Sequence, residues 1–241
     1  MEEALTFTDP AGHKVAGILA TPEEKTDRIA VLCHGFLSNK NSRTNQALTA
    51  LLLPQGIGTF RFDFFGQGES EGPFERITAS LAAWQALAGL DLMSSKGYRK
   101  LALVGSSFGG LVALLAAAQR PRIVCVGLKC PVPDFPEMLN LEFGETGMAQ
   151  WKATDTIPNV VPCGSGRIKL SYAFYEDSLC HSGFDAAKAI TAPTVIVQGA
   201  HDEYVPPRQI LRLSESLGGP NSVAWLPDAD HLNGPYAFGF G

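Results

Sequence analysis

The chain has 241 residues, of which 45% are hydrophobic and 18% are charged, and its formal net charge at pH 7 is −5. A chain this apolar buries enough surface to offset the entropy lost on folding, which excludes an intrinsically disordered protein. The mild acidity provides no basic stripe to neutralise phosphates, so we expect no nucleic-acid partner. The length fits one α/β domain over residues 1–241.

The chain start is acidic, with Glu2 and Glu3, and leads into no apolar segment. It therefore does not resemble a secretory signal. Since no segment reaches the roughly 20 apolar residues that span a bilayer, we expect no membrane partner and a cytoplasmic location.

Short β-branched runs alternate with helical stretches, which is typical of a mostly parallel central sheet flanked by helices. The predicted strands are Ala4–Thr8, Lys14–Leu19, Ile29–Cys33, Gly58–Phe62, Leu101–Val104, Ile123–Leu128, Thr194–Val197 and Val223–Leu226. The predicted helices are Thr44–Leu53, Ile77–Leu92 and Gly109–Gln119. Apolar residues recur every three or four positions in the second helix, and this face, which includes Trp84, is predicted to lie on the sheet.

Residues 131–185 interrupt the alternation of strands and helices, and they precede the predicted strand Thr194–Val197. A segment this long without a core of its own must pack on the main body, so we predict a small cap insertion. Because apolar pockets form where an insertion covers a sheet edge, its apolar side chains are predicted to bind substrate. The alternative is that they only fix the insertion to the body. The residues named for substrate binding are Phe143, Met148, Trp151 and Tyr175.

The five cysteines are Cys33, Cys125, Cys130, Cys163 and Cys180. Their odd number and their spacing fit neither a disulfide framework nor a zinc site. We therefore expect free thiols and no metal or other cofactor, with a bridge inside the Cys130 to Cys180 stretch as the alternative.

The segment Gly105-Ser106-Ser107-Phe108-Gly109 follows a predicted strand and precedes a predicted helix, which is the context that the G-x-S-x-G pattern requires. A serine on such a sharp turn needs glycine two positions away on either side, because side chains there would collide. Ser107 is therefore the predicted nucleophile. The backbone N–H of Phe108 lies at the helix start, where it can stabilise a negative oxygen.

A serine hydroxyl needs a base that accepts its proton and a third group that orients the base. His231 follows the last predicted strand and is the best candidate for the base, whereas His34 more plausibly shapes a loop. Asp202 follows the strand Thr194–Val197 at the same sheet edge and is the predicted acid. Asp228 and Asp230 are the alternatives, although residues adjacent to the base rarely reach its far ring nitrogen.

Several motifs together resemble the α/β-hydrolase superfamily. They are His34-Gly35-Phe36, the turn from Asp63 to Ser70, Gly105 to Gly109, the segment from Gly199 to Pro206, and Asp230-His231. Within the superfamily the sequence is most similar to small feruloyl and cinnamoyl esterases. The resemblance implies an α/β-hydrolase fold with Ser107, Asp202 and His231 as a catalytic triad. It also implies an oxyanion hole formed by the backbone N–H groups of Phe36 and Phe108.

Members of this superfamily usually end with a helix after the histidine loop. Here Leu232–Gly241 contains Gly234-Pro235 and further glycines, and it predicts no helix. A missing helix would expose apolar sheet surface, so we expect either association, as in a homodimer, or instability.

The sequence therefore predicts a serine hydrolase of carboxylic esters with apolar or aromatic acyl groups, acting on a small-molecule ester through an acyl-enzyme. A thioesterase or a serine aminopeptidase would use the same triad. The alternative from another class is a catalytically silent ligand-binding protein on the same fold.

Overall fold

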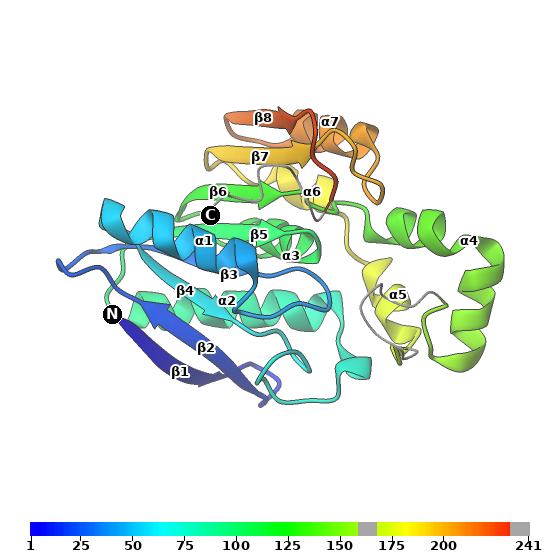
Figure 1. The fold of residues 1–241 in the computed structure, drawn as a ribbon, viewed down its shortest axis with the longest axis horizontal. Coiled ribbons are helices and arrows are strands. Elements are labelled where there is room, and N and C mark those ends of the chain that lie inside the picture. Colours follow the sequence, from blue (N-terminus) through cyan, green and yellow to red (C-terminus); the bar gives the residue numbers. More distant parts are fainter. Residues whose placement is uncertain (159–167, 232–241) are drawn as a thin grey trace.

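The central layer of the computed structural model is a sheet of eight strands (Figure 1), and the structure describes residues 1–158 and 168–231. The strands are β1 (Glu2–Thr8), β2 (Lys14–Ala20), β3 (Arg28–Cys33), β4 (Gly58–Phe62), β5 (Lys100–Ser106), β6 (Ile123–Lys129), β7 (Thr194–Gly199) and β8 (Asn221–Leu226). Their spatial order is β1-β2-β4-β3-β5-β6-β7-β8. Pairing is antiparallel between β1 and β2 and between β2 and β4, and parallel elsewhere, which confirms the predicted fold class.

The helices are α1 (Arg43–Leu52), α2 (Ala79–Ser95), α3 (Phe108–Ala117), α4 (Phe135–Thr154), α5 (Ala173–Ser178), α6 (Gly183–Lys188) and α7 (Pro207–Ser216), with short 3₁₀ helices η1 (Leu53–Gln55) and η2 (Phe74–Arg76). Alternation along β4 places α1 and α2 on opposite faces. The Thr59 hydroxyl bonds Thr49 of α1 at 2.9 Å, whereas the next ring, Phe60, lies under Gly89 of α2. Helices α2, α3, α6 and α7 pack in sequence against one another.

Helix α2 differs from its prediction. Trp84 is 49% exposed, and the buried positions include Ala82, Ala86 and Gly89 instead. The helix is apolar on nearly every side, so periodicity alone could not identify the face that meets the sheet. Small residues let the helix backbone approach the Phe60 and Phe62 rings, which a tryptophan at the contact would prevent.

Helices α4 and α5 project beyond the carboxyl ends of the parallel strands (Figure 1). Gly144 leaves the helical conformation, with φ 60° and ψ 178°, and divides α4 into two segments. The N–H of Gly183 donates to the carbonyl of Pro133 at 2.8 Å, so this part of the chain leaves the body and returns to it at one place. That residues 131–185 form a cap insertion stays a prediction, and this segment is called the cap below.

The prediction of no helix after His231 concerns residues outside the described ones. In the described part of the chain, Val124 and Val195 of neighbouring strands are 44% and 45% exposed. Within residues 1–158 and 168–231, no helix combines the length and the apolar character needed to cross a bilayer.

Candidate active site

Ser107 occupies a sharp turn between β5 and α3. Its φ of 53° and ψ of −117° lie in a region that a side-chain-bearing residue adopts only under strain. A Cβ on Gly105 would lie 2.0 Å from the carbonyl oxygen of Gly109. A Cβ on Gly109 would lie 2.3 Å from the carbonyl oxygen of Cys33. The turn therefore requires both glycines, for the steric reason that the sequence suggested.

The structure brings Ser107, His231 and Asp202 together. Ser107 Oγ lies 2.9 Å from His231 Nε2, and His231 Nδ1 lies 2.8 Å from Asp202 Oδ2. A carboxylate only accepts hydrogen bonds at neutral pH, so Nδ1 carries the imidazole proton and donates it. Nε2 is then free to accept the proton of the serine hydroxyl.

Four N–H groups surround the carboxylate of Asp202. Oδ1 accepts from the backbone N–H groups of Tyr204 and Val205 at 3.0 and 2.9 Å, and Oδ2 accepts from Gln198 Nε2 at 2.6 Å as well as from His231. Burial raises the pKa of Asp202, but His231 and the two backbone N–H groups together outweigh this effect, and the pKa lies below its usual range. Asp202 is therefore ionised at neutral pH.

Gln198 is a residue that sequence reasoning missed. Its side chain is fully buried, and in the described part of the chain its Oε1 atom has no hydrogen-bond partner. An unpaired buried carbonyl destabilises a fold by about 1–3 kcal/mol. The amide thus fixes Asp202 at a cost in stability. The available signal was its position four residues before Asp202, at the end of β7.

The loop after β3 carries Phe36 beside the nucleophile turn. The neighbouring Gly35 lies against Ser107, because a Cβ there would be 3.5 Å from the serine Cβ. Within the described residues, the N–H groups of Phe36 and Phe108 donate to no other protein group. Two free N–H groups near Ser107 fit the predicted role of an oxyanion hole.

Two buried groups hold this loop in place. His34 Nε2 accepts from the N–H of Phe64 at 3.1 Å, and its Nδ1–H donates to the carbonyl of Gly35 at 2.7 Å. The Asp63 carboxylate accepts from both the backbone N–H and the ammonium group of Lys40, each at 2.6 Å. The turn that begins at Asp63 was among the motifs of the family resemblance, but Lys40 was not singled out.

The residues predicted to bind substrate lie in the cap, but they differ in exposure. Trp151 is fully buried, and its Nε1–H donates to the Leu170 carbonyl at 2.7 Å. Met148 is also buried, whereas Phe143 and Tyr175 are half-buried and pack with their rings against Trp151. In this arrangement, Trp151 and Met148 form the interior of the cap and Trp151 offers no surface to a ligand, which corrects the prediction for Trp151.

Other aromatic residues lie closer to the catalytic groups. The Phe36 ring contacts Phe108, Phe135 and Phe174, at centroid distances of 5.7, 6.3 and 5.3 Å. Tyr204 packs edge-on against His231 at 5.2 Å. Sequence reasoning did not select Phe135, Phe174 or Tyr204 for the site, although Tyr204 lies only two residues after Asp202.

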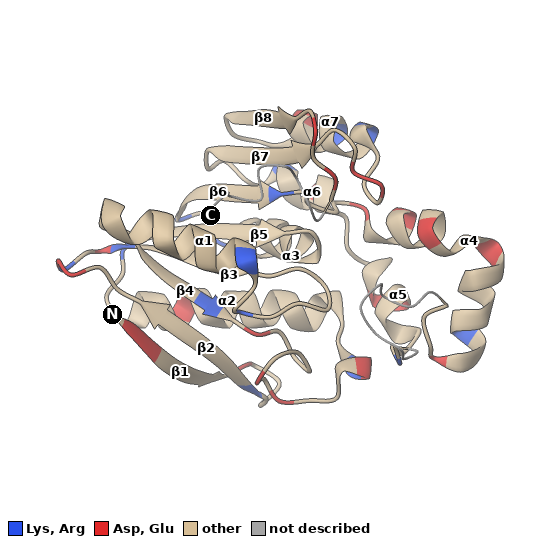
Figure 2. Ribbon diagram, viewed as in Figure 1, with Lys and Arg blue, Asp and Glu red and all other residues tan. Residues whose placement is uncertain are grey.

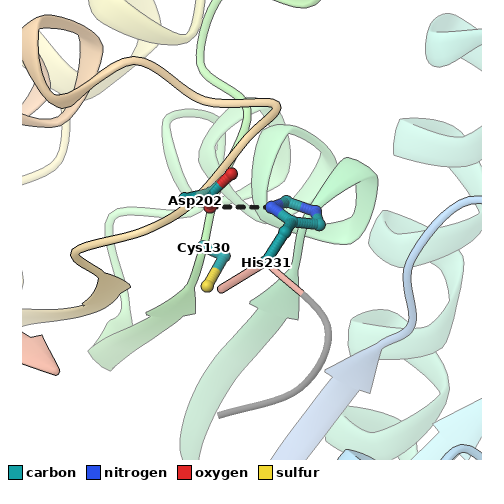
Figure 3. Close-up of side chains that lie close together, drawn as sticks. All are labelled: Cys130, Asp202 and His231. Atoms are coloured by element: carbon teal, nitrogen blue, oxygen red, sulfur yellow. Dashed lines mark hydrogen bonds and ion pairs between the residues drawn. The ribbon is translucent and has the colours of Figure 1, made fainter. Parts of the chain in front are cut away.

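The four described cysteines, Cys33, Cys125, Cys130 and Cys180, are free thiols, and Cys163 lies outside the described residues. Cys130 is buried beside the Asp202–His231 pair (Figure 3). Burial raises the pKa of the Cys130 thiol above its usual value, and the nearby Lys129 ammonium and the backbone of Gly199 offset this effect only in part.

A family model described as the alpha/beta hydrolase family matches residues 30–237. The chain belongs to the α/β hydrolase family. The resemblance inferred from the motifs is thereby confirmed.

Curated relatives of this α/β hydrolase include thioesterases. Mouse mitochondrial palmitoyl-protein thioesterase ABHD10 is 26% identical over 201 residues, which cover 82% of this chain and 66% of the mouse protein. The chain thus spans just under two thirds of that relative. An uncharacterised 31.7 kDa protein in the traX-finO intergenic region of Escherichia coli is 26% identical over 272 residues, covering 95% of this chain and 88% of the bacterial protein.

Solved structures share the fold of this hydrolase over nearly all of its length. Est1E from Butyrivibrio proteoclasticus, with bound ferulic acid, superposes with a TM-score of 0.83 at 23% identity, covering 97% of this chain and 93% of Est1E. A hydrolase from Agrobacterium vitis S4 superposes with a TM-score of 0.81 at 25% identity, covering 96% of this chain and 91% of the other. The likeness to Est1E concerns the fold.

Proposed function

We propose that this α/β hydrolase is a serine esterase that cleaves carboxylic esters with apolar or aromatic acyl groups through an acyl-enzyme. The observation that carries the proposal is the continuous hydrogen-bonded path from Ser107 Oγ through His231 to the Asp202 carboxylate. A strained serine with a correctly oriented base is needed for nucleophilic catalysis and serves no purpose in packing.

In the first half of the reaction, Ser107 Oγ attacks the acyl carbon while His231 Nε2 takes its proton. The N–H groups of Phe36 and Phe108 stabilise the negative charge that develops on the carbonyl oxygen. His231 then returns the proton to the leaving alcohol, and Asp202 stabilises the imidazolium that forms in between.

In the second half, His231 takes a proton from a water molecule, which attacks the acyl-enzyme. The acid leaves and the Ser107 hydroxyl is restored. The chemistry uses only these side chains and backbone groups, and no step involves a cofactor.

The preference for apolar or aromatic acyl groups rests on the surroundings of Phe36. Phe74, at a centroid distance of 5.3 Å from Phe36, is half-buried like Phe36 itself, and the buried rings of Phe135 and Phe174 also contact Phe36. Such a wall binds apolar carbon by burying its surface. Est1E, which has the same fold, binds ferulic acid, an aromatic acid.

A thioesterase is the second candidate, and the names of the ABHD10 relatives favour it. The triad serves both bond types, because a thioester carbonyl is attacked in the same way. A serine aminopeptidase would also need a carboxylate for the substrate ammonium, and a catalytically silent binding protein would need neither the strained serine nor its base.

The decisive experiment compares Ser107→Ala with the matched control Ser106→Ala, which removes the neighbouring hydroxyl. With p-nitrophenyl acetate, Ser107→Ala should lower kcat/KM by at least about a thousandfold, because the triad acts as a unit. A fluorophosphonate probe should label the parent protein and Ser106→Ala, but not Ser107→Ala. Equal hydrolysis by the parent and Ser107→Ala would contradict the proposal, and folded parent protein that resists the probe would favour the binding protein.

Substrate class is measured with matched esters, thioesters and aminoacyl amides of one acyl group. We expect the highest kcat/KM for the ester. A higher value for the thioester would replace the esterase by the thioesterase.

A further inference from the structure

Cys130 directly follows β6 and lies beside the acid and the base of the proposed triad (Figure 3). Its side chain is 4% exposed, and its backbone is fixed by a hydrogen bond from its own N–H to the Val197 carbonyl at 2.8 Å. The Cys130 sulfur, a carboxylate oxygen of Asp202 and a ring nitrogen of His231 all lie within 4.8 Å of one another. The proposed esterase mechanism does not use this thiol.

A thiolate, an imidazole and a carboxylate are the three ligand types that bind zinc in proteins. With metal–ligand bonds of about 2.0–2.3 Å and tetrahedral angles, the ligand atoms of a zinc site are roughly 3.3–3.7 Å apart. The nitrogen and oxygen of the His231–Asp202 pair are 2.8 Å apart, so they must separate by about 0.5 Å to reach this spacing. The Cys130 sulfur, which lies within 4.8 Å of a ring nitrogen and a carboxylate oxygen of this pair, must approach them by about 1 Å at most.

The charges of the three ligands also suit a divalent cation. Cys130 as a thiolate and Asp202 carry two negative charges, which a Zn²⁺ ion balances when the thiol proton leaves. Asp202 Oδ1 stays fixed by the N–H groups of Tyr204 and Val205, and such outer hydrogen bonds orient ligands toward a metal.

We propose that Cys130, Asp202 and His231 form an inhibitory binding site for Zn²⁺. The ion takes the place of the proton between His231 Nδ1 and Asp202 Oδ2, and a water molecule completes the four ligands. A neutral imidazole bound to metal through Nδ1 carries its proton on Nε2. Nε2 then cannot accept the proton of Ser107, and nucleophilic attack stops.

The effect on turnover rests on the proposed function, whereas the binding of the metal does not. The experiment therefore starts from a background protein, Cys125→Ser/Cys163→Ser/Cys180→Ser, in which Cys33 and Cys130 are the remaining thiols. The first readout is a titration with Co²⁺, because a thiolate ligand gives Co²⁺ a charge-transfer band in the near ultraviolet. The band should appear in the background protein and should be absent after Cys130→Ser or Cys130→Ala.

The second readout is inhibition of p-nitrophenyl acetate hydrolysis by Zn²⁺, each protein being compared with its own metal-free rate. Zn²⁺ should inhibit the background protein, and a chelator should reverse the inhibition. In the Cys130 variants, the Zn²⁺ concentration that inhibits by half should rise by about tenfold or more, because the variants lack a direct ligand. Even the loss of a residue that only hydrogen-bonds to a ligand lowers metal affinity by about tenfold.

A Co²⁺ band that persists without Cys130, or no band in the background protein, would overturn the proposal. Equal Zn²⁺ inhibition of the background protein and both Cys130 variants would also overturn it. If the protein hydrolyses no ester, the proposed function fails, and the Co²⁺ band still decides the metal site. If one Cys130 variant does not fold, the other variant supplies the comparison.

Discussion

His34 makes the stability of this hydrolase depend on pH in a way that can be calculated. The imidazole is buried, and both ring nitrogens are used, one as an acceptor from Phe64 N–H and the other as a donor to the Gly35 carbonyl. A second ring proton would sit on Nε2 and point at the N–H of Phe64, so protonation would break this hydrogen bond. Burial is the main cause that lowers the pKa of His34 to about 4, from the ordinary value of 6.5.

The sign follows from which state binds more protons. Between pH 6.5 and about 4 the unfolded chain protonates His34 and the folded chain does not, so the free energy of unfolding falls as the pH falls. The contribution is fully present above pH 6.5 and is lost by about pH 4. A difference of about 2.5 pKa units corresponds to about 3 kcal/mol at most.

The assay is urea unfolding followed by tryptophan fluorescence at pH 7.5 and pH 4.5, for the parent protein and for His34→Asn. Both proteins share every other titrating group, so the difference between their losses isolates His34. The parent should lose about 2–3 kcal/mol more than the variant over this range. His34→Gln, whose amide also donates and accepts, provides a second comparison. Equal losses in the parent and the variants would refute the reasoning.

Three further predictions concern packing and the support of the triad. Gly109→Ala should lower the free energy of unfolding by about 3 kcal/mol, because its Cβ would meet a backbone oxygen at 2.3 Å. The control Gly127→Ala, whose Cβ would lie 3.4 Å from its nearest neighbour, should lower the free energy of unfolding less. Equal urea midpoints of the two variants would contradict this prediction. Trp151→Ala should destabilise the protein by about 3–5 kcal/mol, seen as a lower Tm, and an unchanged Tm would refute its burial in the cap. Gln198→Met should lower kcat about tenfold, because the hydrogen bond to Asp202 is lost, while Tm stays within a few degrees of the parent value. An unchanged kcat together with a much lower Tm would show that the role of Gln198 is purely structural.

Most strands and the turn around Ser107 were predictable because their signals are local. Short β-branched runs bounded by turn residues occupy positions close to those of the strands in the structure, and the glycines around Ser107 are required by contacts within the turn itself. Which face of α2 meets the sheet was not predictable, since an almost wholly apolar helix has no distinct apolar face, and Trp84 proved to be exposed.

In the cap, too, the sequence did not predict which side chains face inward. The cap's length without a core of its own predicted that it packs on the body, but composition cannot tell a residue that faces a ligand from one that fills an interior. Trp151 proved to be internal, while Phe135 and Phe174 contact Phe36. Which ring has which role depends on how α4 bends at Gly144 and where α5 lies against it.

The sequence by itself determined the family, the order of the strands along the chain and the strained serine, because each depends on neighbouring residues and their steric limits. Only the tertiary structure decided that a thiol at position 130 lies beside Asp202 and His231, and that Gln198 holds the acid with an unpaired carbonyl. Cys130, Asp202 and His231 follow three different strands, and their distances are set by the pairing and twist of the sheet, which no local pattern records.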